Sequence, residues 1–401
     1  MHPGSLALKA VFCLFLVLFA GVAPLGAIDE DEILAGPYLT NLRPTHVTVN
    51  YEVNRPVLGW VQFDTEGHFD SGWNYTHGYP PEDVLSDLHH ITLPGLLDDE
   101  RYYYSITLKD PNDDRDYGFF DYSLKTPPEK GQAEVSFRIG VYGDCYGNPT
   151  LLRRVSDDIS SEDDMIAAFL VGDVLPPDYS ETAWRDFFYG VESLGAEKAI
   201  FPLKGANEAS GEAATAFDRY FPLIEGPLDT PKTFGYHSFD WGVLHLIVLD
   251  TLNMDEAQAS WLEQDLQSSA SAPYVLVFLH QPLEELDEGM AGRLEGLFAG
   301  QKVSVVFSGG DGDFRLEERS GVHYVNAGSL TQPAAQESRP IPSEGNGLVL
   351  RDAIPYSSFQ VGKEGDVWLE VISMGSLSPD GQVERDRKSV QKLQILPRNV
   401  P

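Results

Sequence analysis

The first third of the chain alternates between hydrophobic and polar residues. Hydrophobic residues at the odd positions of 47–53 alternate with polar ones, and residues 57–63 repeat the pattern. A period of two is typical of β-strands. Turn residues, such as Asn54-Arg55-Pro56, separate the runs. Short strands at this spacing, with no helical stretch between them, predict a small all-β sandwich over residues 34–127.

The pattern changes after a linker at residues 127–131. Hydrophobic residues then fill consecutive positions, as expected of strands covered on both faces. Helical stretches such as residues 150–159 separate these runs. The repetition of strand and helix predicts an α/β domain over residues 135–375, followed by a C-terminal tail at 376–401. The apolar runs are Phe137–Tyr142, Ala167–Val171, Val243–Leu249, Tyr274–Leu279 and Val303–Phe307.

The N-terminus has the organisation of a signal peptide. Lys9 precedes an apolar run from Ala10 to Ala23, and small residues continue to Ala27. This order predicts a cleaved signal over residues 1–27, and hence a secreted, periplasmic or extracellular protein. A retained membrane anchor is the alternative, although a spanning helix needs roughly 20 apolar residues. We expect no stable membrane span once the signal is removed.

Charge and cysteine content narrow the classes of partner. The 401 residues include 28 basic and 62 acidic side chains, which gives a net charge of −34. Such a chain repels phosphate backbones, so we expect no nucleic-acid partner. Of the two cysteines, Cys13 lies in the predicted signal, and Cys145 therefore has no intrachain disulfide partner.

The candidate chemistry lies directly after the apolar runs. Asp144, Asp173 and His280 each follow a predicted strand. Because ligands of open α/β sheets bind beyond the carboxyl ends of the strands, we expect these side chains to converge. Two-metal hydrolases use such carboxylates and imidazoles to hold the cations that clamp a phosphoester. His245, by contrast, lies inside an apolar run and is expected to be a core residue.

The strand-end motifs, in their order from Phe137 to Ser329, resemble those of the calcineurin-like metallophosphoesterases, in the branch similar to purple acid phosphatases. The all-β segment, with Gly36-Pro37-Tyr38-Leu39 and Tyr102-Tyr103-Tyr104, resembles the fibronectin-type domain that precedes the catalytic domain in that branch. The resemblance implies an α/β sandwich of the metallophosphoesterase type behind a small fibronectin III-like β-sandwich. It further implies that Asp144, Asp173 and His280 are residual metal ligands.

Other motif positions depart from the family pattern. In Gly205-Ala206-Asn207-Glu208, Ala206 replaces a metal-binding asparagine and Asn207 replaces the histidine that assists the leaving group. Gly310 and Gly312 replace two histidine ligands. Since a catalytic metal needs about three protein ligands, the resemblance implies a divalent or iron/zinc-type metal that is weakly bound or absent.

Three functions remain open at this point. The first is a non-catalytic family member, a pseudoenzyme that binds a protein or a phosphorylated ligand. The second is a metal-dependent phosphoric ester hydrolase with an altered site. The third is a calcium-stabilised domain, since Asp311 and Asp313 add oxygen ligands near the site. We favour the alternative that these two aspartates are turn residues of a Gly-Asp-Gly-Asp loop, which their short polar side chains suit.

Overall fold

The computed structural model describes residues 33–66, 75, 77–78, 84–109, 116–146, 148–223, 235–310, 312–330, 347–351, 353–377 and 383–398. The predicted signal peptide at 1–27 and Asp311 lie outside these residues. Within the described ranges, no helix is long and apolar enough to cross a membrane.

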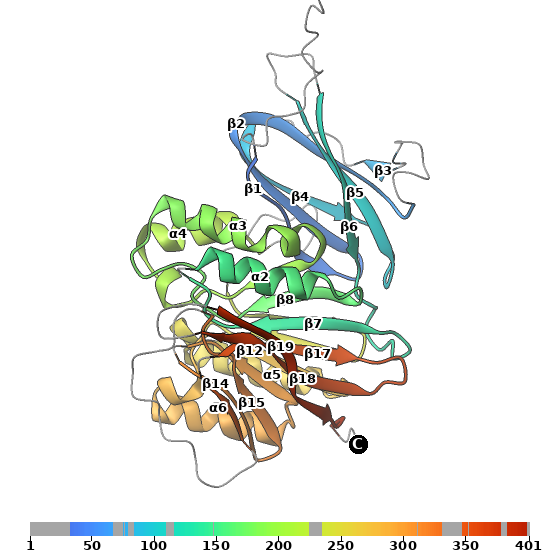
Figure 1. The fold of residues 1–401 in the computed structure, drawn as a ribbon. Helices are drawn as coiled ribbons and strands as arrows, with labels where there is room; N and C mark the ends of the chain where they lie inside the picture. Colours follow the sequence, from blue (N-terminus) through green and yellow to red (C-terminus); the bar gives the residue numbers. More distant parts are fainter. Residues whose placement is uncertain are drawn as a thin grey trace, which may run out of the picture.

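The N-terminal strands form two antiparallel sheets that share one long strand, at the top of Figure 1. The first half of β2 pairs with β1 and β4, and its second half pairs with β3 and β5. The register between β2 and β4 shifts between Glu52 and Val57, around Pro56, which has no N–H for a ladder. The strands are β1 (Ile33–Arg43), β2 (His46–Asp64), β3 (His77–Gly78), β4 (Ser86–Pro94), β5 (Arg101–Lys109) and β6 (Asp116–Lys125).

The polar positions in the first half of β2 are buried as well as the apolar ones. Thr48 and Asn50 are both 0% exposed. Asn41 Nδ2 donates to Thr48 Oγ1 (3.4 Å) and to the carbonyl oxygen of Pro222 (3.1 Å), so this face meets the second half of the chain. The period of two therefore separates two buried faces here, one apolar and one hydrogen-bonded.

The α/β part contains two mixed sheets packed face to face. The order of the first sheet is β19-β18-β17-β7-β8-β9, and that of the second is β10-β11-β12-β13-β15-β14-β16. The first contains β7 (Phe137–Tyr142), β8 (Met165–Leu170), β9 (Ala199–Pro202), β17 (Ala353–Val361), β18 (Val367–Leu377) and β19 (Val383–Ile395). The second contains β10 (His237–Trp241), β11 (Leu244–Val248), β12 (Tyr274–Leu279), β13 (Val305–Ser308), β14 (Phe314–Arg319), β15 (Val322–Asn326) and β16 (Leu348–Leu350).

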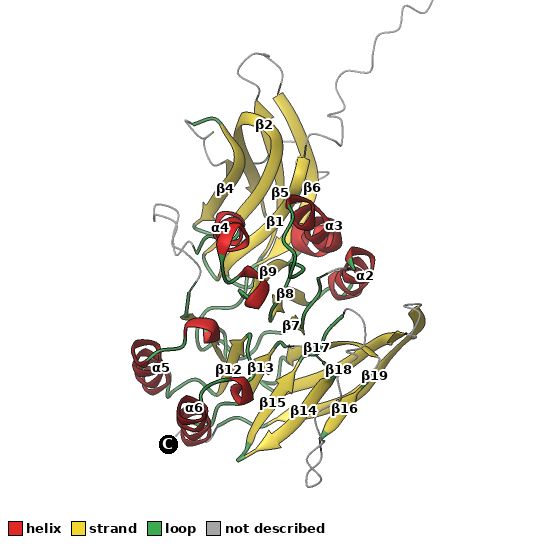
Figure 2. Ribbon diagram, turned by 90° about the vertical axis from the view of Figure 1, so that its left-hand side faces the viewer, coloured by secondary structure: helices red, strands yellow, loops and turns green. Residues whose placement is uncertain are grey.

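Helices cover the outer face of each sheet, as Figures 1 and 2 show. Side chains of α2 (Pro149–Ser160), α3 (Glu181–Glu197) and α4 (Gly211–Tyr220) pack with the first sheet, and those of α5 (Glu256–Ser268) and α6 (Glu288–Gly300) with the second. Phe169 and Phe278 stack between the sheets, with ring centroids 3.9 Å apart. The prediction of an α/β sandwich is thus confirmed. Short 3₁₀ turns are η2 (Ala206–Glu208), η3 (Thr251–Asn253) and η4 (Leu283–Glu285).

The segment at 376–401, predicted to be a tail, contributes a strand to the first sheet. Strand β19 pairs antiparallel with β18, from Leu377↔Val383 to Val367↔Ile395. Most of its residues are exposed, and this polar surface is the reason that the sequence reads as a tail. Beyond β19, the buried guanidinium of Arg398 donates to the carbonyl oxygens of Ala272 (2.5 Å), Gln301 (3.2 Å) and Ser269.

Hydrogen bonds join the N-terminal strands to the α/β part. The Tyr38 hydroxyl donates to the carbonyl oxygen of Tyr220 (2.8 Å), and the Tyr104 hydroxyl donates to that of Ala196 (2.6 Å). A single parallel bridge between Leu39 and Ala199 links β1 to β9. The two halves therefore share one packed boundary.

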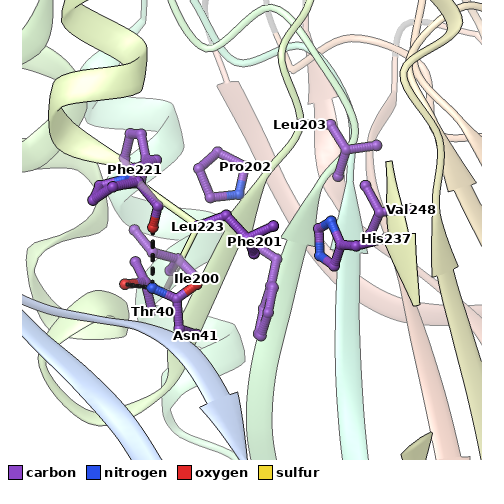
Figure 3. A pocket seen from close by; sticks show the side chains of 11 residues that line it. Thr40, Asn41, Ile200, Phe201, Pro202, Leu203, Phe221, Leu223, His237 and Val248 are labelled. Carbon is purple, nitrogen blue, oxygen red and sulfur yellow. Dashed lines mark hydrogen bonds between the residues drawn. The ribbon is translucent and has the colours of Figure 1, made fainter. Parts of the chain in front are cut away.

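A small pocket lies at this boundary (Figure 3). Thr40 and Asn41 line one side, while Leu203, His237 and Val248 line the other. Its volume of about 30 Å³ leaves room for little more than a water molecule. We therefore regard it as a packing feature of the boundary.

Candidate functional site

The predicted site residues do converge at the carboxyl edge of the first sheet and the facing strand β12. Asp144 follows β7, Asp173 follows β8 and His280 follows β12, and all three are buried. His280 Nε2 lies 3.7 Å from Asp173 Oδ1. The Asp144 backbone bridges to Ser329, beyond β15, and Asp144 Oδ1 accepts a long hydrogen bond from the Gly310 N–H (3.4 Å).

Two glycines allow this close approach. A Cβ on Gly172, whose φ is +150°, would lie 1.8 Å from His280 Nδ1. A Cβ on Gly205 would lie 2.1 Å from Asp173 Oδ1. Since neither neighbour can retreat from the packed sheet edge without a larger shift, both positions require glycine.

The η2 turn folds its backbone onto two of the retained residues. The Ala206 N–H donates to His280 Nε2 (3.2 Å), and the Asn207 N–H donates to Asp173 Oδ1 (2.9 Å). His280 Nδ1 faces the carbonyl oxygen of Val171 at 3.2 Å. These partners assign the proton to Nδ1, because an imidazole nitrogen that accepts an N–H cannot also carry a hydrogen. His280 is therefore a neutral imidazole that bridges two strand-end loops.

Glu208 holds the turn in place. Its Oε1 accepts from the Leu175 N–H (2.7 Å) and its Oε2 from the Gly205 N–H (2.9 Å), and the side chain is 0% exposed. Burial and the nearby charge of Asp173 raise the pKa of Glu208 to about 8. Sequence reasoning did not assign this role, although a glutamate three residues after Gly205 has the spacing of a capping box.

The side chain of Asn207 is also engaged. Its Nδ2 donates to the carbonyl oxygen of Leu175 at 2.7 Å. The Asn207 side chain therefore ties η2 to the loop that contains Leu175, while its backbone N–H donates to Asp173.

The remaining ligand positions offer no donor side chains. Ala206, Gly310 and Gly312 supply none, and the two glycines have φ values of +104° and +128° that L-residues rarely adopt. In the part of the chain that the structure describes, no group of three His, Cys, Asp or Glu residues is arranged to hold a metal ion. Asp313 pairs with Arg351 (3.4 Å). The residues present therefore do not fit the two-metal centre that the family resemblance implied.

Two further titratable residues, Cys145 and His245, are buried in the core. The Cys145 thiol is buried, and burial together with the charge of Asp144 raises its pKa, so it stays protonated. His245 is buried in β11, where Nδ1 pairs with Asp240 Oδ1 (2.9 Å) and Nε2 with Asp265 Oδ2 (2.8 Å). It is thus a core residue, as expected.

Comparison with known proteins supports the fold. No family model matches the chain. The chain is 24% identical over 298 residues to purple acid phosphatase 1 of Ipomoea batatas, an alignment that covers 67% of this chain and 58% of that protein's length. It therefore spans less than two thirds of this relative.

Solved structures agree with this likeness. The purple acid phosphatase PPD1 from yellow lupin (Lupinus luteus) seeds superposes with a TM-score of 0.65 at 16% identity, covering 90% of this chain and 74% of that one. PhoD superposes with a TM-score of 0.68 at 11% identity, covering 91% and 93%. GAP50, the anchor in the inner membrane complex of Plasmodium, superposes with a TM-score of 0.50 at 13% identity, covering 66% of this chain and 90% of that one. The chain has a metallophosphoesterase-type fold.

Proposed function

We propose that this protein is a non-catalytic member of the metallophosphoesterase fold that serves as a binding or scaffold module. The observation that carries the proposal is the pair of amide hydrogen bonds from η2 to His280 and Asp173. In a two-metal hydrolase, the lone pairs of the corresponding imidazole nitrogen and carboxylate oxygen face cations. A metal at this site would have to displace both N–H groups, and few ligands remain to complete its shell.

The junction between the two halves favours a scaffold. Tyr220 donates to Glu52 Oε2 (2.7 Å), and Arg219 pairs with Glu52 (3.2 Å) and Asp87 (3.3 Å). Together with the Tyr38 and Tyr104 hydrogen bonds, these contacts hold the halves in one orientation. A fixed orientation suits a protein that presents surfaces to a partner. Among the similar structures, GAP50 is described as an anchor, which is a role of this kind.

The proposal extends to the N-terminal strands and to location. The arrangement of β1, β2 and β4 in one sheet and of β3, β2, β5 and β6 in the other supports a fibronectin III-like domain. The apolar N-terminal run supports secretion with removal of residues 1–27. We infer a protein or a phosphorylated molecule as partner.

A metal-dependent phosphoesterase with an altered site is the second candidate. It is favoured by the proximity of the retained Asp173 and His280, 3.7 Å apart, beside Asp144. In this case η2 would have to move so that Ala206 and Asn207 release their acceptors. Likeness to purple acid phosphatases supports this candidate as well.

Metal analysis and a phosphatase assay separate the two. The purified mature protein is analysed for bound metal and assayed with an aryl phosphate in the presence of iron, zinc or manganese. We expect neither stoichiometric metal nor turnover. Turnover that is abolished by Asp173→Ala, but kept by Asp163→Ala, would overturn the proposal. Asp163 is a suitable control because it is exposed and lies at the opposite end of β8.

Calcium is tested in the same preparation. A ligand that binds only the native state raises the unfolding temperature. Stabilisation by calcium, but not by magnesium, would support the calcium-stabilised domain and argue against an ion-free module.

A further inference from the structure

A cleft of about 250 Å³ opens on the outer face of the second sheet, beside η4 and over β13, β15 and β14. In Figure 2 these strands lie next to α6 at the lower part of the molecule. Leu279, Leu283, Val306 and Tyr324 form its apolar walls. No residue of the candidate site described above lines it.

Three hydrogen-bond donors form one row across the cleft. Ser308 on β13 is the register partner of Asn326 on β15, which in turn is the register partner of Arg315 on β14. All three side chains line the cleft, so they lie on the same face of the sheet. Neighbouring strands are ~4.8 Å apart, and the row therefore spans about two strand spacings.

These donors have spare capacity. The Asn326 side-chain oxygen accepts the Gly328 N–H (3.0 Å), which leaves the NH₂ group as a donor. Among the residues with described positions, Arg315 has no carboxylate within ion-pair distance, and the Ser308 hydroxyl has no hydrogen-bond partner. The Arg315 guanidinium is therefore available to pair with a ligand.

The acidic residues of the cleft, Glu284 and Glu317, are paired with Arg319. Arg319 pairs with Glu284 (2.8 Å), Glu295 (2.6 Å) and Glu317 (3.3 Å) and lies over the ring of Tyr324 (3.9 Å). Arg315 can therefore balance one negative charge on a ligand. A second negative charge would be repelled by the Glu284 and Glu317 carboxylates that line the same cleft.

We propose that the cleft binds a small monocarboxylic acid with an apolar tail. The carboxylate accepts hydrogen bonds from Arg315, Asn326 and Ser308, and Arg315 supplies a charge-assisted pair. The tail lies on Leu283 and Val306. The volume corresponds to roughly eight waters at ~30 Å³ each, which suits an aryl or short alkyl chain. This inference does not rest on the proposed function, because Asp144, Asp173 and His280 do not line the cleft.

Calorimetric titration of the full chain with three molecules that share one tail tests the ligand class. The probes are 3-phenylpropanoate, 3-phenylpropyl phosphate and 3-phenylpropylamine. We expect saturable one-to-one binding of the carboxylate, with the phosphate and the amine at least tenfold weaker. Absence of saturable carboxylate binding would overturn the proposal, and so would tighter binding of the phosphate or the amine.

Two variants test the position of the site. Arg315→Gln should weaken carboxylate binding at least tenfold, because a charged hydrogen-bond partner is lost. The matched control Arg351→Gln removes a cation that pairs with Asp313 outside the cleft and should change the affinity less than twofold. Ser308→Ala removes one neutral hydrogen-bond donor and changes no charge, so it should weaken binding only about threefold. Unchanged affinity in both Arg315→Gln and Ser308→Ala would place the ligand elsewhere and overturn the proposal.

Discussion

The backbone N–H of Ala206 donates to Nε2 of His280 at 3.2 Å, and this contact defines the character of the strand-end site. His280 stands where the fold would offer an imidazole to a cation. It instead connects the η2 turn to the Val171 carbonyl oxygen through its two ring nitrogens. A residue that resembles a metal ligand in sequence thus acts as a hydrogen-bond bridge between loops.

Replacement of His280 tests this bridging role. His280→Ala should lower the free energy of unfolding by about 1–3 kcal/mol, because the carbonyl oxygen of the buried Val171 and the Ala206 N–H both lose their partner. Urea unfolding of the wild type and the variant measures the loss. Prior treatment of the wild type with a chelator should leave its own midpoint unchanged. A lower wild-type midpoint after chelation would instead indicate a resident metal.

Glu208 should be required for the turn. Glu208→Gln leaves only one side-chain oxygen for the Leu175 and Gly205 N–H groups, and the free energy of unfolding should fall by about 1–3 kcal/mol. The exposed Glu212, in the first turn of α4, provides the control. Glu212→Gln should change the free energy of unfolding by less than about 0.5 kcal/mol. Equal effects of the two substitutions would contradict the assigned role of Glu208.

Restoration of the family motif should be possible but costly. The combined change Ala206→Asn, Asn207→His, Gly310→His and Gly312→His is expected to recover metal binding, which metal analysis would detect. A Cβ meets no close backbone at Gly310 or Gly312, so space is available. Their positive φ values should nevertheless cost about 1–3 kcal/mol at each site. A folded variant without metal would show that the motif alignment is wrong.

His245 should make stability depend on pH. Burial by itself lowers the pKa of His245, but hydrogen bonds and charges from Asp240 and Asp265 outweigh it, and the pKa lies above the usual 6.5. Lys130 and Ser238 complete this cluster through Asp240 and Asp265. A raised pKa stabilises the fold below pH 6.5, and this contribution is lost as pH rises through the folded pKa.

The corresponding measurement compares the wild type with His245→Asn between pH 6 and pH 9. The difference in the free energy of unfolding should be largest near pH 6 and should shrink toward pH 9, by about 1.4 kcal/mol for each unit by which the pKa is raised. A difference that does not vary with pH would mean that His245 is neutral throughout.

Arg398 should hold the ends of α5 and α6. Its guanidinium donates to carbonyl oxygens of Ser269, at the end of α5, and Gln301, at the end of α6. Arg398→Ala should lower the free energy of unfolding by about 1–3 kcal/mol and speed amide exchange in the last turns of both helices. Arg385→Ala, on the exposed side of β19, should leave that exchange unchanged.

The sequence by itself determined the order of strands and helices and the residues that follow each strand. The consecutive apolar runs and the rule that strand ends meet at one edge were sufficient to bring Asp144, Asp173 and His280 together. Strand β19 was missed, because its polar residues run consecutively from Glu384 to Ser389, all of them exposed, and therefore lack the alternation of a half-buried strand. Whether the three retained residues bind a metal stays a prediction.

Only the tertiary structure decided what these side chains contact. The amides of Ala206 and Asn207 have no sequence signature, because every residue except proline carries an N–H and its direction depends on the path of the loop. The same holds for the row of Ser308, Asn326 and Arg315, whose members come from three strands and meet only through the register of the sheet. Residue type fixes which groups can bond, while backbone geometry fixes which of them meet.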